Sequence, residues 1–561
     1  MQVDLLFFPS AQTSVVQWGL GDRRVLLDQP STLAPVLDAW LSTSSAEYCL
    51  FWDLSLGAPD PERVMETIKL PGDVWHAGLH LGTGGLPKLI NFVNPTWMLN
   101  RDADPHLIST SWRLSLKACL MRTDVLRQLG GLDPSYETLD GAALDMGHRF
   151  IARGAFLRHV PNLIPRGRAG EAAAPKLTSY DELRFIRRQY GPKWVAWSMF
   201  RASLNGYSLP ALTRACRRLR SEGVSPLPSP YKRAHRPDRP FVAGQWHDKV
   251  TVLIPTLERY PYLRNELFQL RNQTVRPLEV IVIDQTPAAE REAGLRAEFP
   301  DLPLRIFPQD TFGQCTAWNE GLRAAKGEYV LFLGDDADRI APDFLEKFFR
   351  TFHACAADMV ASVVDEVGAG PPPYNCTFMR ITDIFPITMI KRETLQKSGL
   401  MDFAYDRAKR ADGDLGMRCY CSGALMVLDP DVRLLHHRAP RGGLRKHGVR
   451  VVTYASSKRS LRQRNLPGVS EIYLTLRHFS SQQAYEELWL RTFGSMSMRG
   501  GKVKKVLKLL LGFLMLPDTV WQIRRRYLQA FAMLREYPQI PTLPEPNAKP
   551  TEVDVPAQAL N

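Results

Sequence analysis

The chain has 561 residues, of which 45% are hydrophobic and 23% are charged. This composition excludes a wholly disordered chain, and the length favours two or three domains. The eight cysteines include no CxxC pair, so we expect neither a disulfide framework nor a structural zinc site. The first ten residues, MQVDLLFFPS, form a strand-like apolar run without the basic leader of a signal peptide. This pattern favours a cytoplasmic location.

The net charge of +14 is concentrated in two segments. Residues 214–240 contain 8 basic and 2 acidic side chains, and residues 491–535 contain 10 basic side chains and a single acid, Asp518. Neither segment contains a recognisable nucleic-acid reading module, so we do not expect a nucleic-acid partner. The second segment mixes lysine and arginine with leucine, which predicts a basic amphipathic helix. Such a helix either lies on an anionic membrane surface or packs against its own protein, and both alternatives stay open.

Changes of pattern along the chain predict five regions. Residues 1–222 form a first domain that closes with helices, and residues 223–247 form a linker rich in proline and arginine. Residues 248–450 form a second domain, and residues 451–537 form the basic helical region. Its uncharged run, residues 509–517, is nine residues long, and a membrane span needs about 20, so no transmembrane helix is predicted. Residues 538–561 contain six prolines and are predicted to be a disordered tail.

The second domain alternates strand-like and helix-like blocks. VTVLIP (250–255), LEVIVID (278–284) and EYVLFLG (328–334) are predicted strands, and helical patterns separate them at 262–273 and 315–327. This order is typical of an open parallel sheet with helices on both faces. Ligands of such sheets bind beyond the carboxyl ends of the strands. Asp284 and the acids that follow residue 334 are therefore expected at one common edge.

Three carboxylates lie within four residues, at Asp335, Asp336 and Asp338. They repel one another unless a cation or hydrogen-bond donors compensate, and oxygen ligands favour Mg²⁺ or Mn²⁺. An acid-rich helix start before PDFLEKFFR is the alternative.

Several segments in register resemble the inverting family 2 nucleotide-sugar glycosyltransferases, which have a GT-A fold. They are VTVLIPTLERYPYLRNELFQLRNQT, LEVIVIDQTP, AWNEGLRAAKGEYVLFLGDDADRIAPDFLE, MIKRETLQKSGLMD and DGDLGMRCYCSGALMVLDPDVRLLHH. The resemblance covers about residues 248 to 445. It implies a nucleoside-diphosphate sugar donor, a divalent cation, and a glycan or lipid-linked saccharide as acceptor.

The resemblance also implies roles for individual residues. Around the donor it implies Pro255, Thr256, Glu258, Asp284, Asn319, Asp335 and Asp336, with Arg445 or Arg441 in a basic loop. Around the metal it implies Asp336 and Asp338, or Asp335 in place of Asp336, together with His436; a structural role for His436 and His437 stays open. Asp412 is the implied general base and Asp414 the second candidate. The chain departs from the family's pattern at Gln285, Trp318 and Ala411.

The first half repeats this plan in a reduced form. EYCLFWDLSLGAPDPERV (47–64) parallels EYVLFLGDDADRIAPDFL, and LDMGHR (144–149) parallels GDLGMR (413–418). This similarity indicates a duplicated domain. Asp53 is followed by Leu54 and Ser55 rather than by acids, so the first copy is expected to be a scaffold or acceptor platform. Asp140 and Asp145 are its candidates for a metal-independent site.

The sequence therefore predicts two GT-A-like α/β domains in tandem plus a C-terminal helical segment. The predicted function is metal-dependent, inverting sugar transfer in cell-surface polysaccharide synthesis, by a cytoplasmic protein peripheral to the membrane. A catalytically inactive glycan-binding scaffold is one alternative. A sugar nucleotidyltransferase is another, although no glycine-rich triphosphate loop follows VLIPT.

Overall fold

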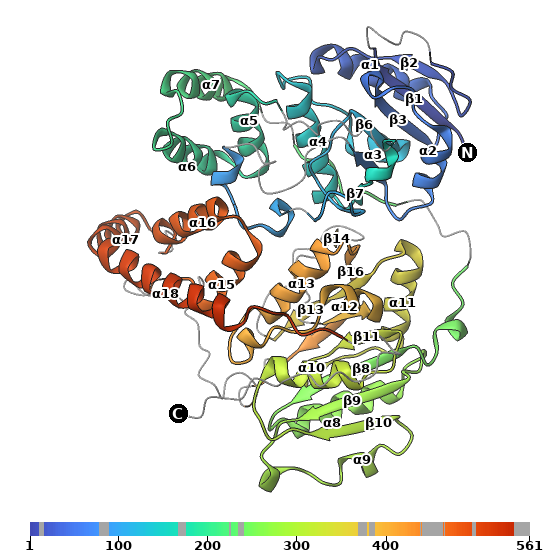
Figure 1. Cartoon of the computed structure of the whole chain (residues 1–561), viewed down its shortest axis with the longest axis vertical. Helices are drawn as coiled ribbons and strands as arrows, with labels where there is room; N and C mark the ends of the chain where they lie inside the picture. The colour runs from blue at the N-terminus through green and yellow to red at the C-terminus, as the bar shows by residue number, and fades with distance from the viewer. Residues whose placement is uncertain are drawn as a thin grey trace.

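The structure is a computed structural model of the chain. It describes residues 1–9, 16–77, 89–101, 103–165, 176–223, 226–233, 240–367, 379–380, 387–437, 439, 442, 464, 466–495 and 501–543. Two α/β domains follow one another, each built on a mixed sheet, and C-terminal helices lie beside both (Figure 1). The predicted fold class, two GT-A-like α/β domains in tandem plus a C-terminal helical segment, is confirmed.

The first domain contains a seven-stranded sheet in the order β2-β1-β3-β6-β4-β7-β5. Its strands are β1 (Val3–Phe8), β2 (Arg23–Val25), β3 (Tyr48–Asp53), β4 (Val74–Ala77), β5 (Ser109–Thr110), β6 (Ala118–Arg122) and β7 (Leu157–His159). Its helices are α1 (Pro30–Thr43), α2 (Pro61–Ile68), α3 (Thr123–Leu129), α4 (Leu139–Ala152), α5 (Ser179–Gln189), α6 (Pro192–Ser203) and α7 (Leu209–Ser221). Every residue of β1 is buried, because elements cover both faces of the sheet.

The second domain contains a nine-stranded sheet in the order β10-β9-β8-β11-β15-β13-β16-β12, with β14 pairing β16. Its strands are β8 (Val250–Thr256), β9 (Glu279–Asp284), β10 (Leu304–Pro308), β11 (Tyr329–Phe332), β12 (Ala337–Asp338), β13 (Met359–Glu366), β14 (Met379–Arg380), β15 (Thr388–Lys391) and β16 (Met426–His436). Its helices are α8 (Tyr260–Arg271), α9 (Leu295–Glu298), α10 (Gln314–Ala324), α11 (Phe344–Cys355), α12 (Arg392–Ser398) and α13 (Ala411–Cys421). The apolar runs of β8, β9 and β11 form the buried parallel centre, as such runs predict.

The two sheets repeat one topology. In chain order β1, β2, β3, β4, β5, β6 and β7 correspond to β8, β9, β11, β13, β14, β15 and β16. The pairings agree as well: the first three strands of each set are parallel, and β6 and β15 each lie antiparallel between two neighbours. This agreement supports the duplication that the sequence predicts.

The copies differ where the acids lie. In the described part of the first domain, β10 and β12 have no counterparts. A short 3-10 turn, η1 (Leu54–Leu56), follows β3 instead, and Asp53 caps it by accepting a hydrogen bond from the Ser55 N–H at 2.9 Å. Asp145 is fully buried and pairs with Arg188 at 2.9 Å. The acid-bearing strand β12 therefore distinguishes the second domain from the first.

The first domain supports α13 of the second domain. The Arg158 guanidinium of β7 donates to the Gly423 carbonyl at 2.9 Å and to Thr110 Oγ1 at 3.0 Å. The Tyr420 hydroxyl of α13 donates to the Thr110 carbonyl at 3.1 Å. A Cβ at Gly423 would lie 2.4 Å from the Ile108 carbonyl oxygen, and its φ is +91°, so this close approach requires glycine.

The C-terminal helices are α15 (Val469–His478), α16 (Ser481–Phe493), α17 (Lys502–Leu514) and α18 (Leu516–Glu536). They contact the first domain through Arg201 of α6, whose guanidinium forms two 2.8 Å hydrogen bonds with the buried Glu486 of α16. Among the described residues, no individual helix has the length and apolar composition of a membrane span. Residues 505–514 and α18 meet those criteria only as a pair, which is bent by 62°.

Candidate active site

Three parallel strands of the second domain end at one edge of the sheet. The ends of β8 and β9 pair Thr256 with Asp284, and β11 leads into Gly334 and the three acids. The Thr256 hydroxyl donates to Asp335 Oδ2 at 3.0 Å. The structure thus brings the predicted residues Thr256, Asp284 and Asp335 to the same edge, where an open α/β sheet binds its ligands.

Asp335 faces the guanidinium group of Arg259, a residue that no sequence motif had indicated. Arg259 Nη1 lies 2.7 Å from Asp335 Oδ1 and 3.8 Å from Asp336 Oδ2. Burial raises the pKa of the Asp335 carboxyl, while the charge of Arg259 opposes that rise. The signal for Arg259 was its place three residues after Thr256, in the loop that leads from β8 to α8.

Asp336 and His436 converge although 99 residues separate them. Strand β12 pairs with the end of β16, and this pairing brings His436 Nε2 to 3.0 Å from Asp336 Oδ1. The Ala439 backbone N–H donates to Asp336 Oδ2 at 2.8 Å. Burial alone would raise the pKa of Asp336, but the hydrogen bond and charge of His436 lower it to about 2. Asp336 is therefore a carboxylate at neutral pH, as a metal ligand must be.

Asp338 lies against α8. Its Oδ1 accepts hydrogen bonds from Asn265 Nδ2 at 2.9 Å and Gln269 Nε2 at 2.7 Å, and from the Arg339 N–H at 2.7 Å. His437 Nε2 lies 2.8 Å from Asp338 Oδ2. Burial acts to raise the pKa of Asp338, but these donors hold it well below its usual range. Asp338 is thus bound to the α8 side, whereas Asp336 meets His436.

A fourth carboxyl group lies behind the acids. Glu266 of α8 is fully buried. Burial first, and then the charges of Asp335 and Asp336, raise its pKa well above the usual range. The buried position therefore favours the uncharged form of this carboxyl group. A glutamate on the apolar face of an otherwise amphipathic helix was the sequence signal for it.

The other residues predicted to bind the donor take different positions. Asp284 is buried and accepts hydrogen bonds from the Tyr260 hydroxyl at 2.6 Å and the Thr286 N–H at 3.0 Å. Pro255, near the end of β8, and Glu258, in the loop after β8, are partly exposed. Asn319 is fully buried, and its amide exchanges two 2.8 Å hydrogen bonds with the Met401 backbone. In this conformation the Asn319 amide holds the Met401 backbone, in the segment before α13. Arg441 and Arg445 lie outside the described residues.

Asp412 lies in the first turn of α13 and is partly exposed. Burial raises the pKa of its carboxyl, which makes the carboxylate a stronger base. The segment before α13 is fixed by Asp406, which accepts hydrogen bonds from the Thr316 N–H at 2.8 Å and the Thr316 hydroxyl at 2.6 Å. The loop before Thr316 is in turn bound to the end of β9, because Gln285 donates to the Gly313 carbonyl at 2.9 Å.

Asp414 is placed differently from Asp412. It is fully buried, and its oxygens pair with Arg418 at 2.8 Å and with His478 of α15 at 2.7 Å. Burial acts to raise the pKa of Asp414, but Arg418 and His478 lower it overall. Its counterpart Asp145 in the first domain is buried against an arginine in the same way. Asp414 therefore has a structural role in α13, and Asp412 is the more accessible of the two carboxyl groups.

Replacing Asp414 with alanine should lower the free energy of unfolding by about 3–5 kcal/mol, because Arg418 would remain buried without its partner. Urea denaturation followed by circular dichroism measures the change. Asp412→Ala is the matched control and should lower the free energy of unfolding much less. Folding lowers the pKa of Asp414. The contribution of Asp414 to stability is therefore complete at a pH above about 3.9, the pKa of an aspartate in the unfolded chain. This contribution is lost as the pH falls through the lower pKa of the folded protein. Equal stability of Asp414→Ala and wild type would contradict the structural role.

Unusual backbone conformations occur beside these residues. Six non-glycine residues of the described chain have positive φ, and three of them are Glu258 at 58°, Arg339 at 55° and Arg410 at 88°. They are a residue of the loop after β8, the residue after Asp338 and the residue two before Asp412. Such conformations cost about 1–3 kcal/mol each and cluster at functional sites.

Within the described residues, no three histidine, cysteine, aspartate or glutamate side chains are arranged to hold a metal ion together. The candidate donor pair is Asp336 and His436, because Asp338 already accepts hydrogen bonds from three donors beside α8. A carboxylate oxygen suits Mg²⁺ or Mn²⁺, and an imidazole nitrogen is acceptable to Mn²⁺. The remaining ligands would have to come from the substrate and water.

Comparisons of the sequence with known proteins find similarity to glycosyltransferases. Residues 251–405 match the sequence model of glycosyl transferase family 2. The putative glycosyltransferase EpsH of Bacillus subtilis is 31% identical over 104 residues, which are 18% of this chain and 30% of EpsH. The glycosyltransferase GlyA of Streptococcus pneumoniae is 30% identical over 114 residues, which are 20% of this chain and 16% of GlyA. The chain therefore spans less than half the length of these curated relatives.

Solved structures show weaker likenesses. The mannosyltransferase PcManGT of Pyrobaculum calidifontis, in complex with GDP-Man and Mn²⁺, aligns with a TM-score of 0.33 at 20% identity, over 64% of this chain and 99% of its own. TarS 1–349 of S. aureus, in complex with UDP-GlcNAc, aligns with a TM-score of 0.35 at 15% identity, over 51% of this chain and 92% of its own. Scores this low support no conclusion about ligands. The family match, in contrast, covers β8, β9, β11 and the acids that follow β11, and ends before Asp412 and His436; residues 251–405 are therefore similar to glycosyl transferase family 2.

Proposed function

We propose that the second domain transfers a sugar, with inversion, from a nucleoside-diphosphate donor to a hydroxyl of a glycan or lipid-linked saccharide. The observation that carries the proposal is the meeting of Asp336 and His436, 3.0 Å apart, at the carboxyl edge of the parallel strands. Inversion follows from a single displacement, in which the acceptor oxygen bonds to the anomeric carbon as the nucleoside diphosphate leaves.

Asp336 and His436 would hold the Mg²⁺ or Mn²⁺ ion of this reaction. Such an ion, when bound, stabilises the charge that develops on the departing diphosphate. Arg259 adds a second positive charge beside Asp335 and Asp336. Asp412 takes the proton of the acceptor hydroxyl, and its raised pKa suits that task.

The first domain serves as a scaffold in this proposal. Arg158 and Tyr420 fix the C-terminal end of α13 against the first domain, so the domain positions the helix that begins beside Asp412. We further propose that the protein acts at the cytoplasmic face of the membrane in cell-surface polysaccharide synthesis. The basic, apolar C-terminal helices support the membrane part of this proposal.

An inactive glycan-binding scaffold is the second candidate. It is favoured by the pairing of every acid in the cluster with a protein group: Asp335 with Arg259, Asp336 with His436, and Asp338 with His437. In an active enzyme the ion would replace the direct contact between Asp336 and His436. In a scaffold these pairs would persist and simply close the sheet edge.

Screening nucleotide sugars for thermal stabilisation of the full chain separates the two candidates. With Mn²⁺ present, we expect one nucleoside-diphosphate sugar to stabilise the protein, by about 2.7 kcal/mol at 100 times its Kd. Chelation of the ion should remove the effect, and the free sugar should have none. If no nucleotide sugar stabilises the chain while an oligosaccharide does, the scaffold function replaces the proposed one.

A further inference from the structure

Helix α17 carries an apolar stripe on its exposed side. Val503, Val506, Leu507, Leu510, Phe513 and Leu514 follow the spacing of one helix face, and their exposed fractions lie between 46% and 79%. Lys508, on the opposite face, is buried. A helix of a globular protein normally buries its apolar stripe and exposes its charges. In α17 the apolar stripe is exposed instead, so this face is available to an apolar partner.

The exposed apolar surface continues onto α18. Val520, Trp521 and Leu528 are between 49% and 60% exposed. Exposed cations lie among them: Lys505 on α17, and Arg524 and Arg525 on α18. Since residues 491–535 contain ten basic side chains and one acid, the surface complements an anionic bilayer. A second copy of the chain would bring like charges together.

An apolar pocket of about 540 Å³ lies between α16 and α18. Its walls include the aromatic residues Tyr485, Trp489, Phe493 and Tyr527, and Val520 and Arg524 of α18 also line it. The volume falls within the range of about 300–1,000 Å³ that is typical of small-molecule sites. The pocket therefore has the size and lining for a hydrocarbon chain, with a guanidinium beside it.

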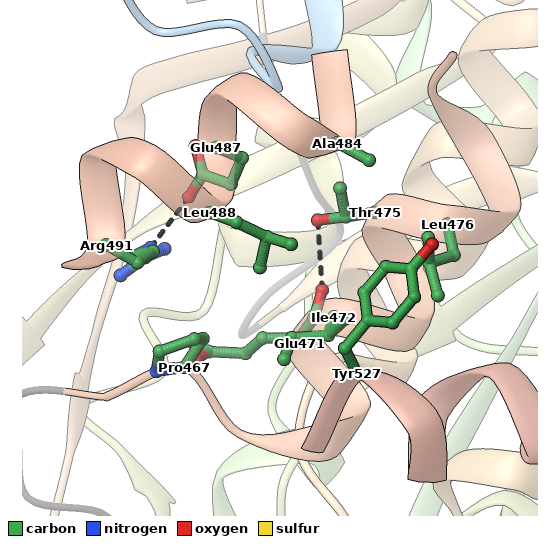
Figure 2. Close-up of a pocket in the computed structure, with 10 residues that line it drawn as sticks. All are labelled: Pro467, Glu471, Ile472, Thr475, Leu476, Ala484, Glu487, Leu488, Arg491 and Tyr527. Carbon is green, nitrogen blue, oxygen red and sulfur yellow. Dashed lines mark hydrogen bonds and ion pairs between the residues drawn. The ribbon is translucent and has the colours of Figure 1, made fainter. Parts of the chain in front are cut away.

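A neighbouring cavity shows where this pocket ends. Tyr527 of α18 and Leu488 and Ala484 of α16 line both spaces, and Figure 2 shows them among the residues around the neighbouring cavity. The neighbouring cavity has a volume of about 20 Å³ and is flanked by the ion pair of Glu487 and Arg491 at 2.7 Å (Figure 2). It has room for about one water molecule. Only the larger pocket can therefore accept a lipid chain.

We propose that α16, α17 and α18 form a docking site for an anionic bilayer. The stripe of α17 lies in the acyl region of the bilayer interface, and the α16–α18 pocket takes one acyl chain of an anionic phospholipid whose phosphate pairs with Arg524. This inference deepens the proposed membrane association, and it does not depend on the sugar-transfer chemistry.

Vesicle flotation of the full chain tests the docking surface. The protein should float with phosphatidylglycerol–phosphatidylcholine vesicles at low salt and at least tenfold less with phosphatidylcholine alone. The double variant Phe513→Glu with Leu514→Glu should lose flotation. A matched pair at similarly exposed residues of the first domain, Leu204→Glu with Leu209→Glu, should float like wild type. Equal loss in both variants, or no flotation of wild type, would overturn the docking site.

Native mass spectrometry with phosphatidylglycerol in detergent tests the pocket. Wild type should retain one lipid per chain. Val520→Trp, which fills the pocket, should reduce retention at least tenfold, whereas Leu528→Trp, on the same helix outside the pocket lining, should not. Equal retention by both variants would overturn the pocket assignment, and a lipid-free dimer would assign the surface to a second copy. The same variants are also tested without lipid for thermal stabilisation by the donor and Mn²⁺. Wild-type stabilisation would show that a variant is folded and that its transferase site is intact.

Discussion

Replacing Asp336 with asparagine should reduce sugar transfer by roughly 100- to 1,000-fold, the usual cost of removing one group that stabilises transition-state charge. The amide keeps the size of the side chain but loses the negative charge that would bind the ion. The measurement is the initial transfer rate with the donor identified by the stabilisation screen, over a range of Mn²⁺ concentrations. The rate of the variant should no longer respond to Mn²⁺ in the range that saturates wild type.

Asp338→Asn is the matched control for Asp336→Asn. Asp338 is bound by Asn265, Gln269 and the Arg339 N–H against α8, so its replacement should disturb the β12 turn more than the response to Mn²⁺. We expect a reduced rate with an Mn²⁺ dependence close to that of wild type. If Asp338→Asn loses that dependence and Asp336→Asn keeps it, the metal ligand is Asp338.

Replacing Asp412 with asparagine should lower kcat by about 10²–10⁴-fold, the range that general base catalysis contributes. Donor binding should be unchanged, because Asp412 acts on the acceptor. The base must be deprotonated to accept a proton. Because burial raises the pKa of Asp412 above its ordinary value, the wild-type rate should fall as the pH drops through that raised pKa.

The pH profile distinguishes a base from a structural residue. In Asp412→Asn the residual rate should lose the acidic decline, and Asp412→Glu should restore part of both the rate and the decline. A variant that keeps the wild-type decline would show that another group titrates, and Asp412 would then not be the base. Donor affinity, measured by titration calorimetry, should stay within a few-fold of wild type in both variants.

The centre of the second domain could be predicted because its strands are short, continuous apolar runs. The runs at 250–255, 278–284 and 328–334 correspond to β8, β9 and β11, since buried parallel strands need apolar residues on both faces. Strand β12 could not be predicted, because its two residues, Ala337 and Asp338, have no periodicity. Yet its pairing with β16 is what brings His436 to Asp336.

The site was predicted by residue type better than by geometry. The acids and His436 were named from the sequence, but spacing alone did not show that Asp336 meets His436 while Asp338 meets Asn265 and Gln269. Likewise, the side chains of Asp412 and Asp414 look equivalent in the sequence. Only the tertiary partners of Asp414, Arg418 and His478, separate a buried structural carboxylate from an accessible one.

Pulsed electron paramagnetic resonance of Mn²⁺ bound to the full chain tests the central claim most directly. With a nucleoside diphosphate present, wild-type protein should show the nitrogen coupling of a histidine ligand. His436→Gln should lose that coupling, and His437→Gln should keep it. A nitrogen coupling that survives in His436→Gln would place the ion elsewhere, and the donor site proposed at the end of β11 would be wrong.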